Sequence, residues 1–182
     1  MGHPTRKVKG VEVNTGALGH GLPIAVGMAL AARMDKFPAR VFTLMGDGEL
    51  AEGSNWEGAQ AAAHYGLDRL TVILDHNNLQ ITGATRDVMS NEPLADKWQA
   101  FGWHVRTVAG HDYAALTEAL TTPPPAEMPL CVLAETVKGK GISFMENVGK
   151  RHHGVPSPEQ LATALAELDA AETRLRGEEV SA

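Results

Sequence analysis

Cysteine is nearly absent from this sequence, and no long apolar run interrupts it. Of the 182 residues one is a cysteine, Cys131, so no disulfide can form within the chain. It lies in the apolar run Leu130–Ala134, where a buried, unreactive thiol is expected rather than a catalytic one. No apolar stretch approaches the roughly 20 residues that cross a bilayer, and the polar start Met1–Lys9 is not a signal peptide. We therefore expect a cytoplasmic protein.

Positive charge is also scarce. Lys and Arg number 16 against 22 Asp and Glu, which gives a formal net charge of -6. Binding to nucleic acid or to an anionic membrane needs Lys and Arg clustered on one face, so we expect neither partner and favour small molecules. Hydrophobic residues at 43% and charged residues at 21% are typical of an ordered globular protein. This length suits one α/β domain, so we expect a single domain over residues 1–182.

Short apolar segments alternate with helical ones along the chain. The predicted strands are Val41–Met45, Leu70–Leu74, Trp103–Val108 and Leu130–Glu135. The predicted helices are Leu22–Met34, Trp56–Tyr65, Leu94–Phe101 and Tyr113–Leu120. The first strand is apolar without alternation, which is typical of a strand buried on both faces. This order indicates right-handed crossovers, so the predicted fold class is α/β, with a mostly parallel sheet and helices on both of its faces.

One further helix is predicted near the end of the sequence. The segment Ser157-Pro158-Glu159-Gln160 resembles a capping box with proline in the first turn. The helix that follows keeps Leu161, Leu165 and Leu168 on one face.

The strongest local signal for a ligand is a Gly-Asp-Gly turn in the segment Gly46–Gly53, between a buried strand and a helix. Ligands of parallel sheets bind beyond the carboxyl ends of the strands, and the start of a helix favours an anion such as phosphate. Gly46 and Gly48 allow the backbone to approach a ligand closely. Asp47 would repel a phosphate unless a cation bridged the two, so we interpret Asp47 as a metal ligand.

A second polar strand end completes the predicted metal site. The strand Leu70–Leu74 runs directly into Asp75-His76-Asn77-Asn78-Leu79. A hard cation such as Mg²⁺ takes about six oxygen ligands, and the Asn77 side chain and the Leu79 main-chain carbonyl can join Asp47 as ligands. Each motif alone is also a common turn or strand exit. The two together, one strand–helix unit apart, favour the metal site.

These motifs resemble the thiamine diphosphate fingerprint of the transketolase family, in which Gly-Asp-Gly is followed by an asparagine pair. Further stretches fall in the order of that family: Gly2-His3-Pro4, Asn14–Gly21, Trp56-Glu57, Leu94–Trp98, Phe101–Trp103, Gly110–Asp112, Thr136–Gly141 and His153-Gly154. Residues 1 to about 170 look like the diphosphate-binding domain, in the form found as the N-terminal subunit of split transketolases.

The resemblance implies a set of cofactor-binding residues. Asp47, Asn77 and the Leu79 carbonyl would hold Mg²⁺, or Ca²⁺ or Mn²⁺ in its place. The residues implied in binding thiamine diphosphate are Gly16, Leu18, Gly46, Asp47, Gly48, Glu49, Asn77, Ile81 and His153. Gly48 and His153 would contact the diphosphate, and Gly16 and Leu18 would line the aminopyrimidine.

The resemblance also implies three catalytic residues, His3, Glu52 and His153. His3 would hydrogen-bond the donor sugar. Glu52 resembles the acidic residue that joins the two cofactor sites of a dimer, although a glutamate in the first turn of a helix is also favoured by the helix dipole alone. Of the adjacent pair His152 and His153, the following glycine favours His153 as the residue that faces the phosphates.

The implied activity is transfer of a two-carbon ketol unit from a ketose phosphate, as in the pentose phosphate reactions, to an aldose or aldehyde. The glutamate that activates the cofactor in this family belongs to a separate pyrimidine-binding domain, for which residues after 154 leave no room. The resemblance therefore implies a transferase subunit that is active only with a partner. The partner would carry the pyrimidine-binding and C-terminal domains, in a heterotetramer or dimer of heterodimers.

Two departures from the family pattern keep other functions open. Family members usually carry further residues before the Gly-His-Pro motif, so we expect the domain to be incomplete at its N-terminal side. His20 and Ala17 replace residues that are usual there, a glutamine and a serine or proline. One alternative is another thiamine diphosphate enzyme, such as a deoxyxylulose-phosphate synthase or a 2-oxo acid dehydrogenase component. The other is a non-catalytic subunit that assembles or regulates another chain.

Overall fold

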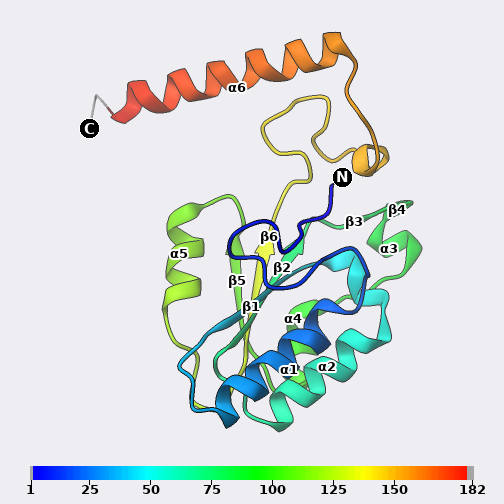
Figure 1. The fold of residues 1–182 in the computed structure, drawn as a ribbon. Helices are drawn as coiled ribbons and strands as arrows, with labels where there is room; N and C mark the ends of the chain where they lie inside the picture. Colours follow the sequence, from blue (N-terminus) through cyan, green and yellow to red (C-terminus); the bar gives the residue numbers. More distant parts are fainter. Residues whose placement is uncertain (1, 180–182) are drawn as a thin grey trace.

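The computed structural model describes residues 2–179, and its centre is a four-stranded parallel sheet with the order β1-β2-β6-β5 (Figure 1). The strands of this sheet are β1 (Val41–Gly46), β2 (Leu70–His76), β5 (His104–Ala109) and β6 (Leu130–Glu135). The helices that alternate with them are α1 (Gly21–Met34), α2 (Gly53–His64), α4 (Leu94–Ala100) and α5 (Tyr113–Thr121). The remaining elements are η1 (Asp47–Ala51), β3 (Leu79–Gln80), β4 (Gly83–Ala84), α3 (Thr85–Val88), η2 (Gly149–His152) and α6 (Pro158–Glu179).

The α/β class, the parallel sheet and each predicted strand and helix are confirmed. The largest shift at the start of an element is in α2, which begins at Gly53 instead of Trp56. Its first turn holds Gly53, Ser54 and Asn55, which show no apolar periodicity and so gave no sign of a helix.

The main core lies between one face of the sheet and the layer formed by α1, α2 and α4 (Figure 1). A Cβ placed on Gly58 of α2 would lie 3.2 Å from Leu22 Cγ of α1, so glycine allows the two helices to pack closely. Trp98 and Trp103 are almost completely buried with ring centroids 4.8 Å apart. They are core residues, as expected for large aromatic side chains in a domain of this size.

On the other face of the sheet, the described helix that packs over the strands is α5, which lies over β5 and β6. There α5 packs against a cluster that contains Leu130 and Val132. On β1, Phe42 and Leu44 are 47% and 72% exposed. The prediction that this strand is buried on both faces was wrong, because β1 is an edge strand and no described helix covers its outer face.

The predicted capping box is present at the start of α6. The Gln160 amide donates to Ser157 Oγ at 3.2 Å, and the Ser157 amide donates to Gln160 Oε1 at 3.1 Å. The helix then runs apart from the sheet (Figure 1), tethered by Ser143, whose amide and hydroxyl donate to the Glu167 carboxylate at 2.8 and 2.5 Å. None of the described helices is long and apolar enough to cross a membrane.

Candidate functional site

The ends of β1 and β2 bring the two predicted metal-binding motifs together. The register pairs Gly46 with Asp75, so the residues that follow each strand leave the sheet side by side. Asp47 Oδ2 accepts a hydrogen bond from the Asn78 amide at 2.6 Å, and Asp47 Oδ1 accepts one from the Gly48 amide at 2.8 Å. The first contact joins residues far apart in the sequence and fixes the Gly-Asp-Gly turn against the asparagine pair.

Asp47 is only 2% exposed, which is unusual for a residue that can carry a negative charge. Burial raises the pKa of Asp47, while the hydrogen bonds from the Asn78 and Gly48 amides and the charge of His76 lower it by less. No Lys or Arg of residues 2–179 forms a salt bridge with Asp47. A bound cation would supply the positive charge that the ionised carboxylate lacks.

Asn77 is oriented by its neighbours. Its Oδ1 accepts from the Leu79 amide at 3.0 Å, and its Nδ2 donates to Asp75 Oδ1 at 3.2 Å. Asp75 is held in turn by a short hydrogen bond from the Thr136 hydroxyl, which follows β6. An amide oxygen keeps a second lone pair after one hydrogen bond, so Asn77 Oδ1 can still bind a cation.

The donor set around Asp47 suits a hard cation. Over residues 2–179 there is no group of three or more His, Cys, Asp or Glu side chains that could hold a metal ion. The available donors are one carboxylate, one carboxamide and the main-chain carbonyl of Leu79, all oxygens. Such a set suits Mg²⁺, Ca²⁺ or Mn²⁺ when a ligand's phosphate oxygens complete the coordination.

Beside these oxygen donors, position 48 has no space for a side chain. A Cβ on Gly48 would lie 2.6 Å from Gln80 Cβ and 3.6 Å from the Leu79 carbonyl oxygen. Nearby, Gln80 Oε1 is buried and has no hydrogen-bond partner within the described part of the chain. A close backbone approach and an unsatisfied buried polar atom both fit a site that receives a polar ligand.

Two predicted residues, His3 and His153, lie near His152 and Lys138. The rings of His152 and His153 are 4.6 Å apart, and Lys138 Nζ lies 3.5 Å from His152 Nδ1. The ring of His3 lies 3.4 Å from the position that a Cβ on Gly16 would take. Burial, together with the charges of Lys138, His153 and His3, lowers the pKa of His152. We call His3, Lys138, His152 and His153 the basic group. A cluster of basic side chains favours a bound anion.

The β3–β4 hairpin lies between the basic group and the Gly-Asp-Gly turn. On one side β3 packs against η1, which carries Asp47, and on the other side β4 packs against η2, which precedes His153. The hairpin was not predicted, because its two-residue strands are too short to show a pattern.

The other predicted residues, all within the described part of the chain, form no hydrogen bond with the Asp47 carboxylate. Leu18 and Ile81 are 50% and 51% exposed, which leaves two apolar side chains open to a ligand or a partner. Glu52 is exposed and its side chain caps no helix amide. Glu49 is directed at the loop before α1, where its Oε1 accepts from the Gly19 amide at 2.9 Å.

Sequence reasoning did not identify Asp75, Thr136 or Gln80 as parts of the site. Asp75 belongs to the polar strand exit and could have been suspected from its place next to the asparagines. Thr136 follows β6, and only the strand order shows that β6 lies beside β2. Gln80 is recognisable only from its contact with Gly48.

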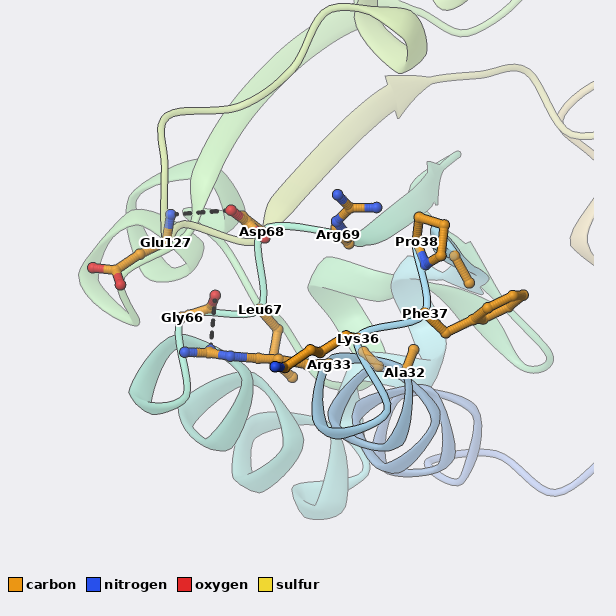
Figure 2. A pocket seen from close by; sticks show the side chains of 12 residues that line it. Ala32, Arg33, Lys36, Phe37, Pro38, Gly66, Leu67, Asp68, Arg69 and Glu127 are labelled. Carbon is orange, nitrogen blue, oxygen red and sulfur yellow. Dashed lines mark hydrogen bonds between the residues drawn. The ribbon is translucent and has the colours of Figure 1, made fainter.

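A cavity of about 330 Å³ lies at the opposite end of the sheet, where the strands begin (Figure 2). Its polar groups hold the chain turns together. Arg33 donates a short hydrogen bond to the Tyr65 carbonyl and a longer one, 3.4 Å, to that of Gly66, and Asp68 Oδ2 accepts from the Glu127 amide at 3.5 Å. The Arg33 contacts cap the end of α2. Because the cavity lies at the end of the sheet opposite to Asp47 and Asn77, it is separate from the candidate site.

Comparison with known proteins identifies the family of this chain. Residues 1–168 match the family described as the thiamine diphosphate binding domain of transketolase. One subunit of the apulose-4-phosphate transketolase of Actinobacillus succinogenes is 48% identical over 168 residues, which are 92% of this chain and 61% of that protein. The 6-deoxy-6-sulfo-D-fructose transketolase subunit SqwG of a Clostridium species is 42% identical over 165 residues, 90% of this chain and 60% of that protein. This chain therefore spans about three fifths of the length of these relatives.

Solved structures lead to the same fold. The crystal structure of transketolase from Campylobacter jejuni superimposes with a TM-score of 0.81 at 33% identity, over 90% of this chain and 27% of that one. Transketolase from Leishmania mexicana gives a TM-score of 0.70 at 27% identity, over 93% of this chain and 30% of that one.

Proposed function

This chain belongs to the transketolase family of thiamine diphosphate-binding domains, and from that premise we propose that it binds thiamine diphosphate through a divalent cation held by Asp47, Asn77 and the Leu79 carbonyl. The observation that carries the proposal is the hydrogen bond between Asp47 and the Asn78 amide, because it places the buried carboxylate beside the asparagine turn. The cation is Mg²⁺, or Ca²⁺ or Mn²⁺ in its place.

The remaining cofactor contacts follow from the same arrangement. Gly46, Gly48 and Glu49 belong to the turn and helix that receive the diphosphate, and His153 contacts it from the basic group. Gly16 and Leu18 face the aminopyrimidine, and Ile81 packs near the cofactor. The exposure of Leu18 and Ile81 supports these contacts, since burial of half-exposed apolar side chains favours binding.

The proposed reaction is transfer of a two-carbon ketol unit from a ketose phosphate, such as one of the pentose phosphate reactions, to an aldose or aldehyde. Bound thiamine diphosphate supplies a thiazolium that acts as an electron sink. His3 hydrogen-bonds the hydroxyl of the donor sugar, and His153, which contacts the diphosphate, is the second histidine to which we assign a catalytic role. Glu52 connects the site to its symmetry mate, and its exposed side chain leaves it accessible for that contact.

The chain works with a partner. Two relatives are named as subunits of transketolases, and this supports a second polypeptide that carries the pyrimidine-binding and C-terminal domains. The complete assembly is a cytoplasmic heterotetramer, a dimer of heterodimers, with its cofactor sites between subunits.

Calorimetric titration with thiamine diphosphate tests the proposal, with Mg²⁺ or with EDTA, and with or without a candidate partner chain. We expect metal-dependent binding, a loss of at least about 10-fold in affinity for Asp47→Ala because a metal ligand is removed, and ketol transfer only with the partner. Unchanged affinity in Asp47→Ala contradicts the metal site. Release of CO₂ from pyruvate without ketol transfer favours the synthase or dehydrogenase alternative. If thiamine diphosphate binds neither with nor without the partner chain, the result favours a non-catalytic subunit.

A further inference from the structure

The loop that precedes α1 has one buried residue. The exposed part of the loop is joined to the start of the chain, where the Thr15 amide and hydroxyl donate to the Pro4 carbonyl at 3.1 and 2.9 Å. From Asn14 to His20 every residue is exposed except Gly19. This loop contains Gly16 and Leu18, which the proposed function places at the aminopyrimidine. The contact between this loop and the segment 49–54 is made at Gly19.

Gly19 is held at both of its main-chain groups by one short stretch of sequence. Glu49 Oε1 accepts from the Gly19 amide at 2.9 Å, and Ser54 Oγ donates to the Gly19 carbonyl at 2.6 Å. Both side chains are half-buried, so water competes weakly for these bonds. We call Glu49, Ser54 and Gly19 the loop clamp.

The clamp requires glycine. Gly19 has φ +79°, in the left-handed region that favours glycine. A Cβ at this position would lie 2.6 Å from Ser54 Oγ and 2.7 Å from Glu52 Cβ. The loop therefore sits directly against the turn that opens α2, without space for a side chain between them.

The clamp is built on the metal-binding turn. Glu49 lies two positions after Asp47 in the same 3-10 helix, η1. The main chain of Glu49 is fixed from behind, because the completely buried Asn55 donates from Nδ2 to its carbonyl at 2.7 Å. Asp47 and the Glu49–Gly19 hydrogen bond therefore belong to one continuous turn.

We propose that Glu49 and Ser54 are positioning residues that lock the loop Asn14–His20 to the metal-binding turn, so that metal and diphosphate binding at η1 orders the surface expected to receive the aminopyrimidine. The existence of the clamp stands on its own geometry. Its effect on the cofactor rests on the proposed function.

Hydrogen exchange in the protein without cofactor tests the clamp itself, with residue resolution from NMR. We expect Glu49→Ala to speed exchange of the Gly19 amide about 3- to 10-fold, since one hydrogen bond to a charged acceptor is lost. Glu49→Gln keeps an acceptor oxygen and should restore exchange to within about 2-fold of wild type. Ser54→Ala is a milder variant and should speed exchange across Asn14–His20. Glu118→Ala, an exposed position on α5, is the matched control.

Exchange within about 2-fold of wild type in both Glu49→Ala and Ser54→Ala overturns the clamp. A second measurement adds thiamine diphosphate and Mg²⁺. In wild type, exchange should slow in η1 and in the loop; in Glu49→Ala it should slow in η1 and remain fast in the loop. Slowing of both segments in the variant overturns the coupling. If η1 does not respond in wild type, the proposed function fails, while the first measurement still decides whether the clamp exists.

Discussion

Asp47 carries a charge problem that the chain alone does not solve. Burial raises its pKa from the ordinary value of 3.8, so the folded protein holds the proton over a pH range in which the unfolded chain has released it. Over that range the folded state binds more protons, and the free energy of unfolding falls as pH rises. In the metal-free protein, Asp47 therefore lowers stability at neutral pH relative to a neutral side chain of the same shape.

Comparison with the Asp47→Asn variant should show this fall in the free energy of unfolding directly. The free energy of unfolding of wild type minus that of the variant should fall as pH is raised from about 4, and level off once the folded carboxyl is ionised. Urea denaturation at a series of pH values, without metal, measures it. Mg²⁺ with thiamine diphosphate should then stabilise wild type and leave the variant unchanged. Asp169→Asn on the exposed part of α6 is the control, and a difference that rises with pH contradicts the argument.

His152 reports on the charge of the basic group. Burial and the charges of Lys138, His153 and His3 lower its pKa below 6.5, so folding favours its neutral form. Its contribution to stability is present above pH 6.5 and is lost as pH falls through the folded pKa. An NMR titration of the imidazole should give a midpoint below 6.5. Lys138→Ala should raise that midpoint, and so should added thiamine diphosphate with Mg²⁺, because an anion favours the protonated ring.

A distant cation provides the comparison for that titration. Lys36→Ala removes a positive charge at the end of α1, far along the chain from the basic group, and should leave the His152 midpoint unchanged. A midpoint that does not move in Lys138→Ala would show that Lys138 does not contribute to the local charge.

At the scale of elements, α5 is held to the sheet by one side chain from β5. Arg106 Nη1 donates to the carbonyls of Ala119 and Thr122 at 2.7 Å each, and Nη2 donates to that of Pro123 at 3.0 Å. These are the free carbonyls at the C-terminus of α5, where a positive charge is also favoured by the helix dipole.

Removing this side chain should loosen α5. We expect Arg106→Ala to lower the free energy of unfolding by about 1–3 kcal/mol, because three hydrogen bonds from a charged group are lost. Arg106→Lys should recover only part of this, since an ammonium cannot reproduce the planar fork. Denaturant unfolding measures both. Arg174→Ala, exposed on α6, should change stability by less than about 0.5 kcal/mol.

Elements of ordinary length could be predicted from the sequence, and short ones could not. The apolar runs of β2 and β6 and the Ala-, Leu- and Met-rich run of α1 indicated their boundaries closely. The β3–β4 hairpin and η1 hold too few residues for any period to appear. The predicted convergence of Asp47 with the asparagine turn needed only the rule for parallel strand ends. The loop clamp joins Gly19 to residues some thirty positions away and depends on a loop path that no local pattern encodes.

At the scale of the whole molecule, the strand order was the missing information. Once β1 is known to be an edge, the exposure of Phe42 and Leu44 follows, because α5 packs over β5 and β6 at the other side of the sheet. Leu44 has little apolar contact to lose, whereas Val72 of β2 is completely buried. We expect Leu44→Ser to change the free energy of unfolding by less than about 0.5 kcal/mol and Val72→Ala to lower it by about 2 kcal/mol. A large loss in Leu44→Ser would show that the outer face of β1 is covered.

Cofactor binding and assembly should be coupled if the site lies between subunits. Thermodynamic linkage requires that, when a partner chain raises the affinity for thiamine diphosphate by some factor, the cofactor raises the affinity for the partner by the same factor. We expect a factor of about 10 or more, since the partner that we propose would supply the contacts to the pyrimidine ring. Calorimetry measures the first affinity with and without partner, and analytical ultracentrifugation measures the second with and without cofactor and Mg²⁺. Asp47→Ala should bring both factors close to one without abolishing association. If the partner did not change the affinity for the cofactor, and the cofactor did not change the affinity for the partner, the cofactor would contact this chain alone. The proposal of a site between two chains would then be wrong.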